Sequence, residues 1–298
     1  MKRRDFLQSG AALAALPLLG RAAAIVPGPA MAGTLHRLTA AGAEDNRATF
    51  MPDGRTILFA SKRSGKSQIW AMNPDGGDVR RLHVSTANDS GRVAPNADGT
   101  RLCFSSDRSG QNGVYVLELA GGRVTPVSDP AFWSFGPTWS SSDLIAFFSR
   151  KGGNAINTWT VRPDGSQARQ ITNQAGESRQ PWWSPDGQTL ALSADHGTGR
   201  FQVWLMNADG SDSRAITTAG SCEQPFWSPD GQRIAISAKI DGPHHRIYIM
   251  RSDGAEVRAI GQPEGVENVH PTWSPDGGSI VFTSGSGAAA SLQRFDLA

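Results

Sequence analysis

A five-residue motif recurs along this chain at almost constant spacing, and this periodicity restricts the fold more than any other sequence feature. "WSPDG" begins at Trp183, Trp227 and Trp273. Weaker copies are "FMPDG" from Phe50, "PNADG" from Pro95 and "WSSSD" from Trp139. Successive copies begin 45, 44, 44, 44 and 46 residues apart. Six repeats of this length account for residues 34–298, so the chain is built from one repeated unit.

Each repeat has the same internal order of short strands and turns. A short apolar strand ends at Pro-Asp-Gly, which favours a tight turn because proline fixes φ and glycine tolerates positive φ. An alternating strand such as "QTLALSA" follows, then a Gly-rich loop and an aromatic strand such as "QVWLMN". A second Asp-Gly turn leads to a short outer strand, "RQIT" or "RAIT". Four strands per repeat are typical of a β-propeller blade.

The last repeat is incomplete, because the chain stops after the third strand, "SLQRFDLA". Residues 34–39, "TLHRLT", precede the first complete repeat and match the outer strands of the others. We therefore predict a six-bladed β-propeller in which the N-terminal strand completes the last blade. Such closure removes two sheet edges that would otherwise be free to aggregate.

Tryptophan recurs at equivalent positions of the repeats, where Phe50 and Tyr115 replace it in two cases. Large rings at such positions fill the space between neighbouring blades. We expect packing rather than ligand stacking for Trp70, Trp139, Trp159, Trp183, Trp204, Trp227 and Trp273.

The N-terminus has the features of an export signal. Arg3-Arg4, followed by Asp5, Phe6 and Leu7, resembles the twin-arginine pattern, and the apolar run "AALAALPLLG" is too short to span a bilayer. Small residues at 22–24 and 30–32 offer cleavage positions. We predict a twin-arginine signal peptide and linker over residues 1–32, a propeller over residues 33–298, a periplasmic location, and no transmembrane segment in the mature chain.

Composition excludes several functional classes. The formal net charge of +2 argues against a nucleic-acid-binding protein. Two cysteines, Cys103 and Cys222, do not make a disulfide framework, and no cysteine follows the apolar run as a lipoprotein anchor would require. We expect a monomer.

Propellers bind ligands at the mouth of the central channel, on the face formed by the loops before the inner strands and the loops joining the second and third strands. The residues just before the inner-strand proline, or its equivalent, differ from blade to blade. They are Arg47, Arg92, Gly136, Gln180, Gln224 and His270. Three residues upstream stand Glu44, Asp89, Trp133, Glu177, Ser221 and Glu267. Such variety at equivalent positions favours a binding site, and the alternative is a solvated rim.

Two further features would lie at this mouth. "DPAFWSFGP" places Phe132, Trp133 and Phe135 before the third inner strand, where they could contact a partner or pack inward. The loops joining second and third strands are rich in Lys and Arg and would favour an anionic partner. These residues are Lys62, Arg63, Lys66, Arg108, Arg150, Lys151, Arg200, Lys239 and Arg246, against Asp107, Asp195 and Asp241.

The sequence predicts no catalytic set, metal or cofactor. His270, Gln224, Gln180 and Glu267 would be a poor zinc set because only one imidazole is present. "NADGSD" at 207–212 lacks the spaced glutamate of a calcium loop. We expect His244 and His245 to be exposed in a long loop, and Cys222 to be a small filler.

"PTWSPDGGSIVFTS" and "FASKRSGKSQIWAMNPDGGDVRRL" resemble the propeller repeats of the TolB family, over essentially all of residues 34–298. This resemblance implies a periplasmic component of the Tol system, but TolB has an α/β domain before its propeller, and roles of that domain are not expected here. Similar repeats precede the catalytic domain of prolyl-oligopeptidase-like peptidases, whose G-x-S-x-G motif does not occur here. Oligogalacturonate lyases, which hold a metal and histidines at the centre of a propeller, are also similar.

From these observations we expect a non-enzymatic, TolB-like binding or scaffold protein for an envelope protein or an anionic envelope component. The alternative is an enzyme, a lyase or hydrolase that acts on an acidic polysaccharide at the channel mouth.

Overall fold

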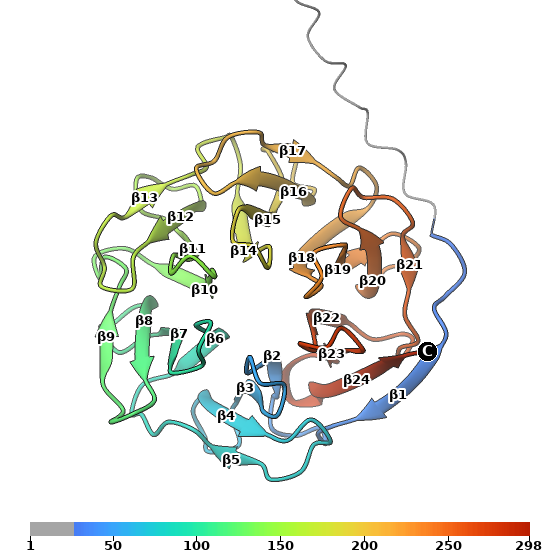
Figure 1. The fold of residues 1–298 in the computed structure, drawn as a ribbon, viewed down its shortest axis with the longest axis horizontal. Coiled ribbons are helices and arrows are strands. Elements are labelled where there is room, and N and C mark those ends of the chain that lie inside the picture. Colours follow the sequence, from blue (N-terminus) through green and yellow to red (C-terminus); the bar gives the residue numbers. More distant parts are fainter. Residues whose placement is uncertain (1–26) are drawn as a thin grey trace, which may run out of the picture.

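The computed structural model describes residues 27–298 and consists of six four-stranded antiparallel sheets arranged around one axis (Figure 1). The six-bladed β-propeller predicted from the repeats is therefore confirmed. Each sheet contains one 44-residue repeat, with its first strand next to the axis and its last strand at the rim.

Each blade contains four strands. Blade 1 contains β2 (Asn46–Phe50), β3 (Ile57–Ser61), β4 (Gln68–Met72) and β5 (Arg80–Arg81). Blade 2 contains β6 (Asp89–Pro95), β7 (Arg101–Ser106), β8 (Gly113–Glu118) and β9 (Val124–Pro126). Blade 3 contains β10 (Ser134–Trp139), β11 (Ile145–Ser149), β12 (Asn157–Val161) and β13 (Arg169–Gln170). Blade 4 contains β14 (Ser178–Trp183), β15 (Thr189–Ala194), β16 (Gln202–Asn207) and β17 (Arg214–Ala215). Blade 5 contains β18 (Ser221–Trp227), β19 (Arg233–Lys239), β20 (Arg246–Arg251) and β21 (Arg258–Ala259). Blade 6 contains β22 (Asn268–Trp273), β23 (Ser279–Ser284), the short 3-10 helix η1 (Gly287–Ala289), β24 (Ser291–Leu297) and β1 (Gly33–Arg37).

The Ser-Pro-Asp-Gly turns are stabilised by hydrogen bonds to their own aspartate, which is present in all three WSPDG copies. In blade 4 the Asp186 carboxylate accepts hydrogen bonds from the Ser184 hydroxyl at 2.5 Å and from the Gln188 backbone amide at 3.0 Å. Gly187 adopts a φ of 69°, which a residue with a Cβ adopts only at a cost. The same turn recurs in blades 5 and 6, and it reverses the chain between the first and second strands.

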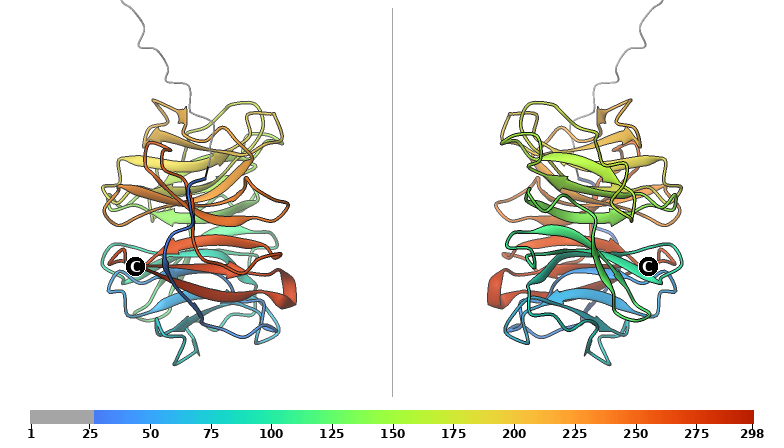
Figure 2. Two further views of the ribbon diagram at one scale, coloured as in Figure 1. Left: turned by 90° about the vertical axis from the view of Figure 1, so that its right-hand side faces the viewer. Right: turned by 90° about the vertical axis from the view of Figure 1, so that its left-hand side faces the viewer.

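The ring closes as the sequence predicts. Strand β1 pairs antiparallel with β24, from Gly33 opposite Leu297 to Arg37 opposite Gln293. In Figures 1 and 2 this N-terminal strand, in blue, runs along the outer edge of the red sixth blade. The side chains of β1 are exposed, so the strand contributes mainly backbone hydrogen bonds, and the first buried residue after it is Leu38.

The hydrophobic core lies between the blades. Trp139, Trp183, Trp227 and Trp273 at the ends of the inner strands are buried, with exposed fractions of 8%, 4%, 7% and 2%. Each belongs to a cluster that joins residues of two neighbouring blades. This arrangement agrees with the packing role predicted for the recurrent tryptophans.

The predicted signal peptide lies almost entirely within residues 1–26, which are outside the described residues, so it stays a prediction. Residues 27–32 of the predicted linker are described and follow the rim of blade 5. The Gly28 amide donates to Val257 O at 2.8 Å and the Met31 amide to Ala259 O at 2.8 Å. Over residues 27–298 no helix has the length and apolar character needed to cross a membrane.

Candidate binding pocket at the channel mouth

Every inner strand contains a β-bulge near its start, where the pairing with the second strand shifts register. One bulge residue per blade adopts a positive φ of between 54° and 76°. These residues are Arg47, Gly91, Gly136, Gln180, Gln224 and His270. A left-handed conformation is costly for residues other than glycine and concentrates at functional positions. Arg92 follows Gly91, because blade 2 carries one extra bulge residue. The bulges redirect the predicted mouth residues away from the sheet surface.

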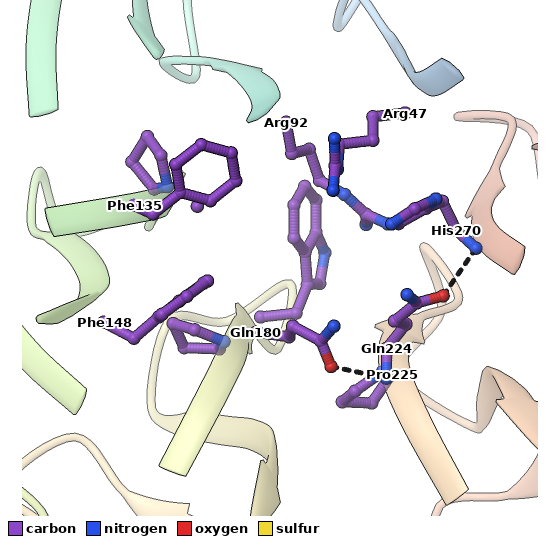
Figure 3. Close-up of a pocket in the computed structure, with 12 residues that line it drawn as sticks. Arg47, Arg92, Phe135, Phe148, Gln180, Gln224, Pro225 and His270 are labelled. Atoms are coloured by element: carbon purple, nitrogen blue, oxygen red, sulfur yellow. Dashed lines mark hydrogen bonds between the residues drawn. The ribbon is translucent and has the colours of Figure 1, made fainter. Parts of the chain in front are cut away.

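Side chains of the preceding blade bind the backbone amides at these bulges. The Gln224 amide donates to Ser193 Oγ at 3.0 Å and to Gln180 Oε1 at 3.2 Å, both in blade 4. The His270 amide donates to Gln224 Oε1 at 2.7 Å (Figure 3). The Ser237 hydroxyl donates to the same oxygen at 2.7 Å. Neighbouring blades are therefore joined by hydrogen bonds at the mouth as well as by apolar packing.

The same connection is made by a hydroxyl of the second strand in two other places. Arg47 donates its backbone amide to Thr283 Oγ1 at 3.2 Å, and Gly136 donates to Ser105 Oγ at 3.0 Å. The equivalent positions in blades 1 and 3 are Ala60 and Phe148, which have no hydroxyl. Phe148 instead turns an aromatic ring toward the channel.

Seven of the residues predicted for the mouth, Gly136 and Phe135 included, line one pocket, together with residues that the sequence reasoning missed (Figure 3). The cavity has a volume of about 60 Å³, which is room for roughly four water molecules. It is lined by Arg47, Arg92, Phe135, Gly136, Pro137, Phe148, Gln180, Pro181, Trp182, Gln224, Pro225 and His270. No acidic side chain lines it among residues 27–298.

The two arginines of the pocket are half-buried and lack a carboxylate partner within the described chain. Arg92 lies over the rings of Trp182 and Phe226, 4.8 and 5.1 Å from their centroids, and donates to Pro271 O at 3.4 Å. Arg47 lies 5.5 Å from the centroid of Phe135.

Their pKa values reflect this surrounding. Burial lowers the pKa of Arg47, and burial together with the neighbouring Arg47 charge lowers the pKa of Arg92 to about 9. With this pKa Arg92 remains charged at neutral pH, and arginine side chains are in general protonated there.

His270 is kept neutral at the same place. Burial and the charges of Arg47 and Arg92 hold its pKa well below the ordinary value. Its Nδ1 atom is buried and has no hydrogen-bond partner in the described part of the chain. The pocket thus combines two cations, a neutral imidazole and two side-chain amides.

An aromatic wall occupies the blade 3 side of the pocket. The rings of Trp133 and Phe135 stack with 5.8 Å between centroids, and Phe148 lies 5.7 Å from Trp133 and 5.9 Å from Phe135. Phe132 is 37% exposed outside this group. The three aromatic residues of the predicted segment therefore have different surroundings. Phe135 lines the pocket, Trp133 packs against Phe135, and Phe132 faces solvent.

Trp182 of blade 4 and Phe226 of blade 5 stack with 3.9 Å between their ring centroids. Trp182 lines the mouth pocket and also a second cavity of about 190 Å³, which Phe226 lines as well. Trp139, Trp227 and Trp273 and the turn prolines form other walls of that cavity. Trp182 therefore stands between an opening at the mouth and an opening on the turn face.

Most of the basic loop residues at the mouth are paired, which corrects the expectation of a free basic ring. Arg63 and Arg108 each bind an aspartate of the loop before the inner strand, Asp45 at 2.7 Å and Asp89 at 2.9 Å, and both aspartates are fully buried. Ion pairs also neutralise Lys62, Lys151, Lys239 and Arg246. The sequence did not indicate this pairing because most of these acids lie in a different loop of the blade from the basic residues.

His245 is also placed differently from the expectation, since its side chain is only 18% exposed and lies between two carboxylates. Its Nδ1 is 2.7 Å from Glu267 Oε2 and its Nε2 is 3.4 Å from Glu223 Oε1. Burial opposes protonation of His245, but the two carboxylates outweigh it and raise its pKa. Burial also opposes ionisation of Glu267, yet hydrogen bonds from His245 lower its pKa to about 2.

The remaining predicted residues lie beside the pocket rather than in it. Glu177 forms an ion pair with Arg179, and Glu267 is engaged by His245. Within residues 27–298 no group of three or more His, Cys, Asp or Glu side chains is placed to hold a metal ion. Cys222 is buried, and burial raises the pKa of its thiol to about 12, so it acts as an apolar filler.

Comparison with known sequences relates the chain to TolB at modest identity. No family model matches it. A TolB homologue of Chlorobium luteolum is 35% identical over 162 residues, which are 54% of this chain and 36% of that protein. The chain thus matches little more than a third of the length of this curated relative.

Comparison with solved structures relates the fold to TolB, to a gluconolactonase and to an oligogalacturonate lyase. TolB of Acinetobacter baumannii superposes with a TM-score of 0.62 at 18% identity, covering 74% of this chain and 58% of that one. A gluconolactonase of Xanthomonas campestris gives 0.66 at 18%, covering 89% of both chains. An oligogalacturonate lyase in complex with manganese gives 0.60 at 16%, covering 90% and 94%. At these identities the likeness concerns the fold alone.

Proposed function

We propose that this chain is a non-enzymatic binding module that holds an envelope protein, or another anionic envelope component, at its channel mouth. One observation carries the proposal. Chemically different polar side chains from five blades converge on one pocket, and four of them occupy left-handed backbone positions. Packing alone would not require strained, unlike residues at equivalent positions of a repeat.

The charge of the pocket supports an anionic partner. The outer basic residues are largely compensated by ion pairs, whereas Arg47 and Arg92 have no acid beside them in residues 27–298. A partner that presents a negative group would supply the missing charge. The likeness to TolB and the predicted twin-arginine signal support a periplasmic setting for this interaction.

Site-specific photo-crosslinking in cells tests the proposal. A photoreactive residue at Phe132, which is exposed beside the pocket, should capture an envelope component, and Arg92→Gln should reduce the yield. The matched control is the same probe at Asp53, an exposed turn residue on the opposite face. Equal capture from both positions, or no capture from Phe132, would contradict a binding role for the mouth.

A second candidate is a lyase or hydrolase acting on an acidic polysaccharide. The specific observation in its favour is His270, whose neutral imidazole and unpartnered Nδ1 lie beside two guanidinium groups. A neutral imidazole can accept a proton, and a guanidinium can hold a sugar carboxylate. Turnover of oligogalacturonates by the purified protein, lost in His270→Gln, would favour this candidate over the binding module.

A further inference from the structure

The two pocket arginines differ from the other arginines at the mouth in what surrounds them. Arg63 and Arg108 each donate to a Ser hydroxyl and to a fully buried aspartate, so their charges are neutralised within the protein. Arg47 and Arg92 have only a weak contact each, at 3.4 Å, to an amide or carbonyl oxygen. Most of their donor hydrogens are therefore available to a ligand.

Two glutamines add further donors, and their orientation is fixed by the hydrogen bonds described above. Gln180 Oε1 accepts from the Ser193 hydroxyl and the Gln224 amide, and Gln224 Oε1 accepts from Ser237 and His270. Because each oxygen already accepts two hydrogen bonds, each side-chain NH₂ group is left as a donor without a hydrogen-bond partner among residues 27–298. Figure 3 shows the nitrogen of Gln224 turned toward the guanidinium groups.

The opposite side of the pocket offers no donors. Phe135 and Phe148 form it (Figure 3), and Pro137 and Trp182 also line the pocket. A tetrahedral oxyanion such as phosphate would press at least one oxygen against these carbons. A carboxylate attached to an apolar group has two oxygens on one side and carbon on the other, which matches the division of the pocket.

We propose that the mouth pocket is a receptor for a carboxylate group whose neighbouring carbon bears a small apolar substituent. Arg47 and Arg92 bind the two oxygens, the amides of Gln180 and Gln224 donate to them, and the aromatic wall covers the substituent. The pocket is small, with a cavity of about 60 Å³, and we limit the proposal to one such terminal group. The group can come from a short-chain carboxylic acid or from the C-terminus of a polypeptide, and the inference rests on the proposed binding role of the mouth.

Calorimetry and thermal melting with isobutyrate test the receptor. Isobutyrate should bind and raise the melting temperature, whereas isobutyramide and inorganic phosphate should bind at least tenfold more weakly. Arg47→Gln and Arg92→Gln should each weaken isobutyrate binding about tenfold to a hundredfold, the range expected for one charged hydrogen bond. Arg150→Gln is the control, since Arg150 lies over Trp133 outside the pocket, and it should change affinity less than twofold.

The stability of the ligand-free variants separates a binding role from a structural one. Arg92→Gln removes one of two neighbouring buried charges, so without ligand its melting temperature should equal or exceed that of the original protein. A lowered melting temperature with unchanged isobutyrate binding would show that Arg92 serves the fold. Absent isobutyrate binding, or equal binding of isobutyramide, would overturn the receptor.

Competition in the crosslinking experiment distinguishes the two proposals and the two sources. If a dipeptide ending in a free Val carboxylate abolishes capture from Phe132 and its amidated form does not, the carboxylate is a chain end. If isobutyrate binds but Phe132 captures nothing, the receptor stands and the protein-binding role fails. If capture is strong and neither acid competes, the binding role stands and the receptor is wrong.

Discussion

The side-chain oxygen of Gln224 accepts the backbone amide of His270 from the next blade at 2.7 Å, directly at the channel mouth. The same oxygen accepts the hydroxyl of Ser237 in the second strand of blade 5. One glutamine side chain therefore links two strands of its own blade to the inner strand of the next. The residues that line the pocket therefore also connect the blades.

Replacing this oxygen should lower the stability of the propeller without creating a cavity. Gln224→Met keeps the length of the side chain but leaves the His270 amide and the Ser237 hydroxyl without their acceptor. We expect a loss of about 1–3 kcal/mol in the free energy of unfolding. Chemical denaturation measures it, with Gln188→Met as the control, because Gln188 is exposed in a turn and its replacement should change stability by less than about 0.5 kcal/mol.

Closure of the ring predicts an effect of two N-terminal truncations. A protein that begins at Gly33 keeps β1 and loses only the contacts of residues 27–32 with blade 5. A protein that begins at Leu38 exposes the edge of β24 and should melt at a much lower temperature and self-associate. Melting curves and light scattering compare the two. Similar melting of both proteins would mean that β1 does not contribute to the stability of blade 6.

Gly136 makes room for the aromatic wall. Its φ is 62°, and a Cβ there would lie 2.3 Å from Phe148 Cε1. Gly136→Ala should therefore combine backbone strain with a steric clash, whereas Gly110→Ala, at φ 98° with no atom within 4 Å, tests the strain alone. We expect Gly136→Ala to be the more destabilising by about 1–3 kcal/mol. Adding Phe148→Ser should recover part of the difference, as a double-mutant cycle would measure.

Two histidines should give opposite pH dependences of stability. The pKa of His270 is lowered in the fold, so the unfolded chain takes up a proton first and stability is lost as the pH falls below about 6.5. The pKa of His245 is raised, so its stabilising contribution is complete below about 6.5 and is lost as the pH rises through its folded value.

Melting temperatures between pH 5 and 8 distinguish the two contributions. Relative to the original protein, His270→Gln should gain stability as the pH falls from 7 to 5. His245→Gln should be most destabilising at the acidic end, because Glu267, with a pKa of about 2, stays ionised there. The same pH dependence for both variants would contradict the assigned surroundings.

The repeat predicts the fold well because one local pattern, an apolar strand followed by Ser-Pro-Asp-Gly, is complete in three blades and recognisable in the other three. Arg47, Gln224 and His270 occupy equivalent positions in that pattern, and in the structure all three line one pocket. Phe148 and Trp182 were missed because they lie within strands and read as core residues. A comparison of equivalent positions would have found them. At the position of Phe148 the other blades carry a small or hydroxyl residue, and at the position of Trp182 four of the other blades carry Thr or Ala.

The charge balance of the mouth could not be predicted in the same way. Asp45 and Asp89 pair with arginines that follow 18 and 19 residues later, across two strands of the same blade. Sequence proximity does not indicate such pairs, because they depend on how the loops fold over each other. The environment of His245 is similar, since one of its two carboxylates comes from the next blade.

Trp182 is a wall of two cavities that open on opposite faces of the disc. A molecule bound in either cavity contacts this indole. Any ligand that does move the indole at the mouth reshapes the far cavity as well, so binding on one face is thermodynamically linked to binding on the other.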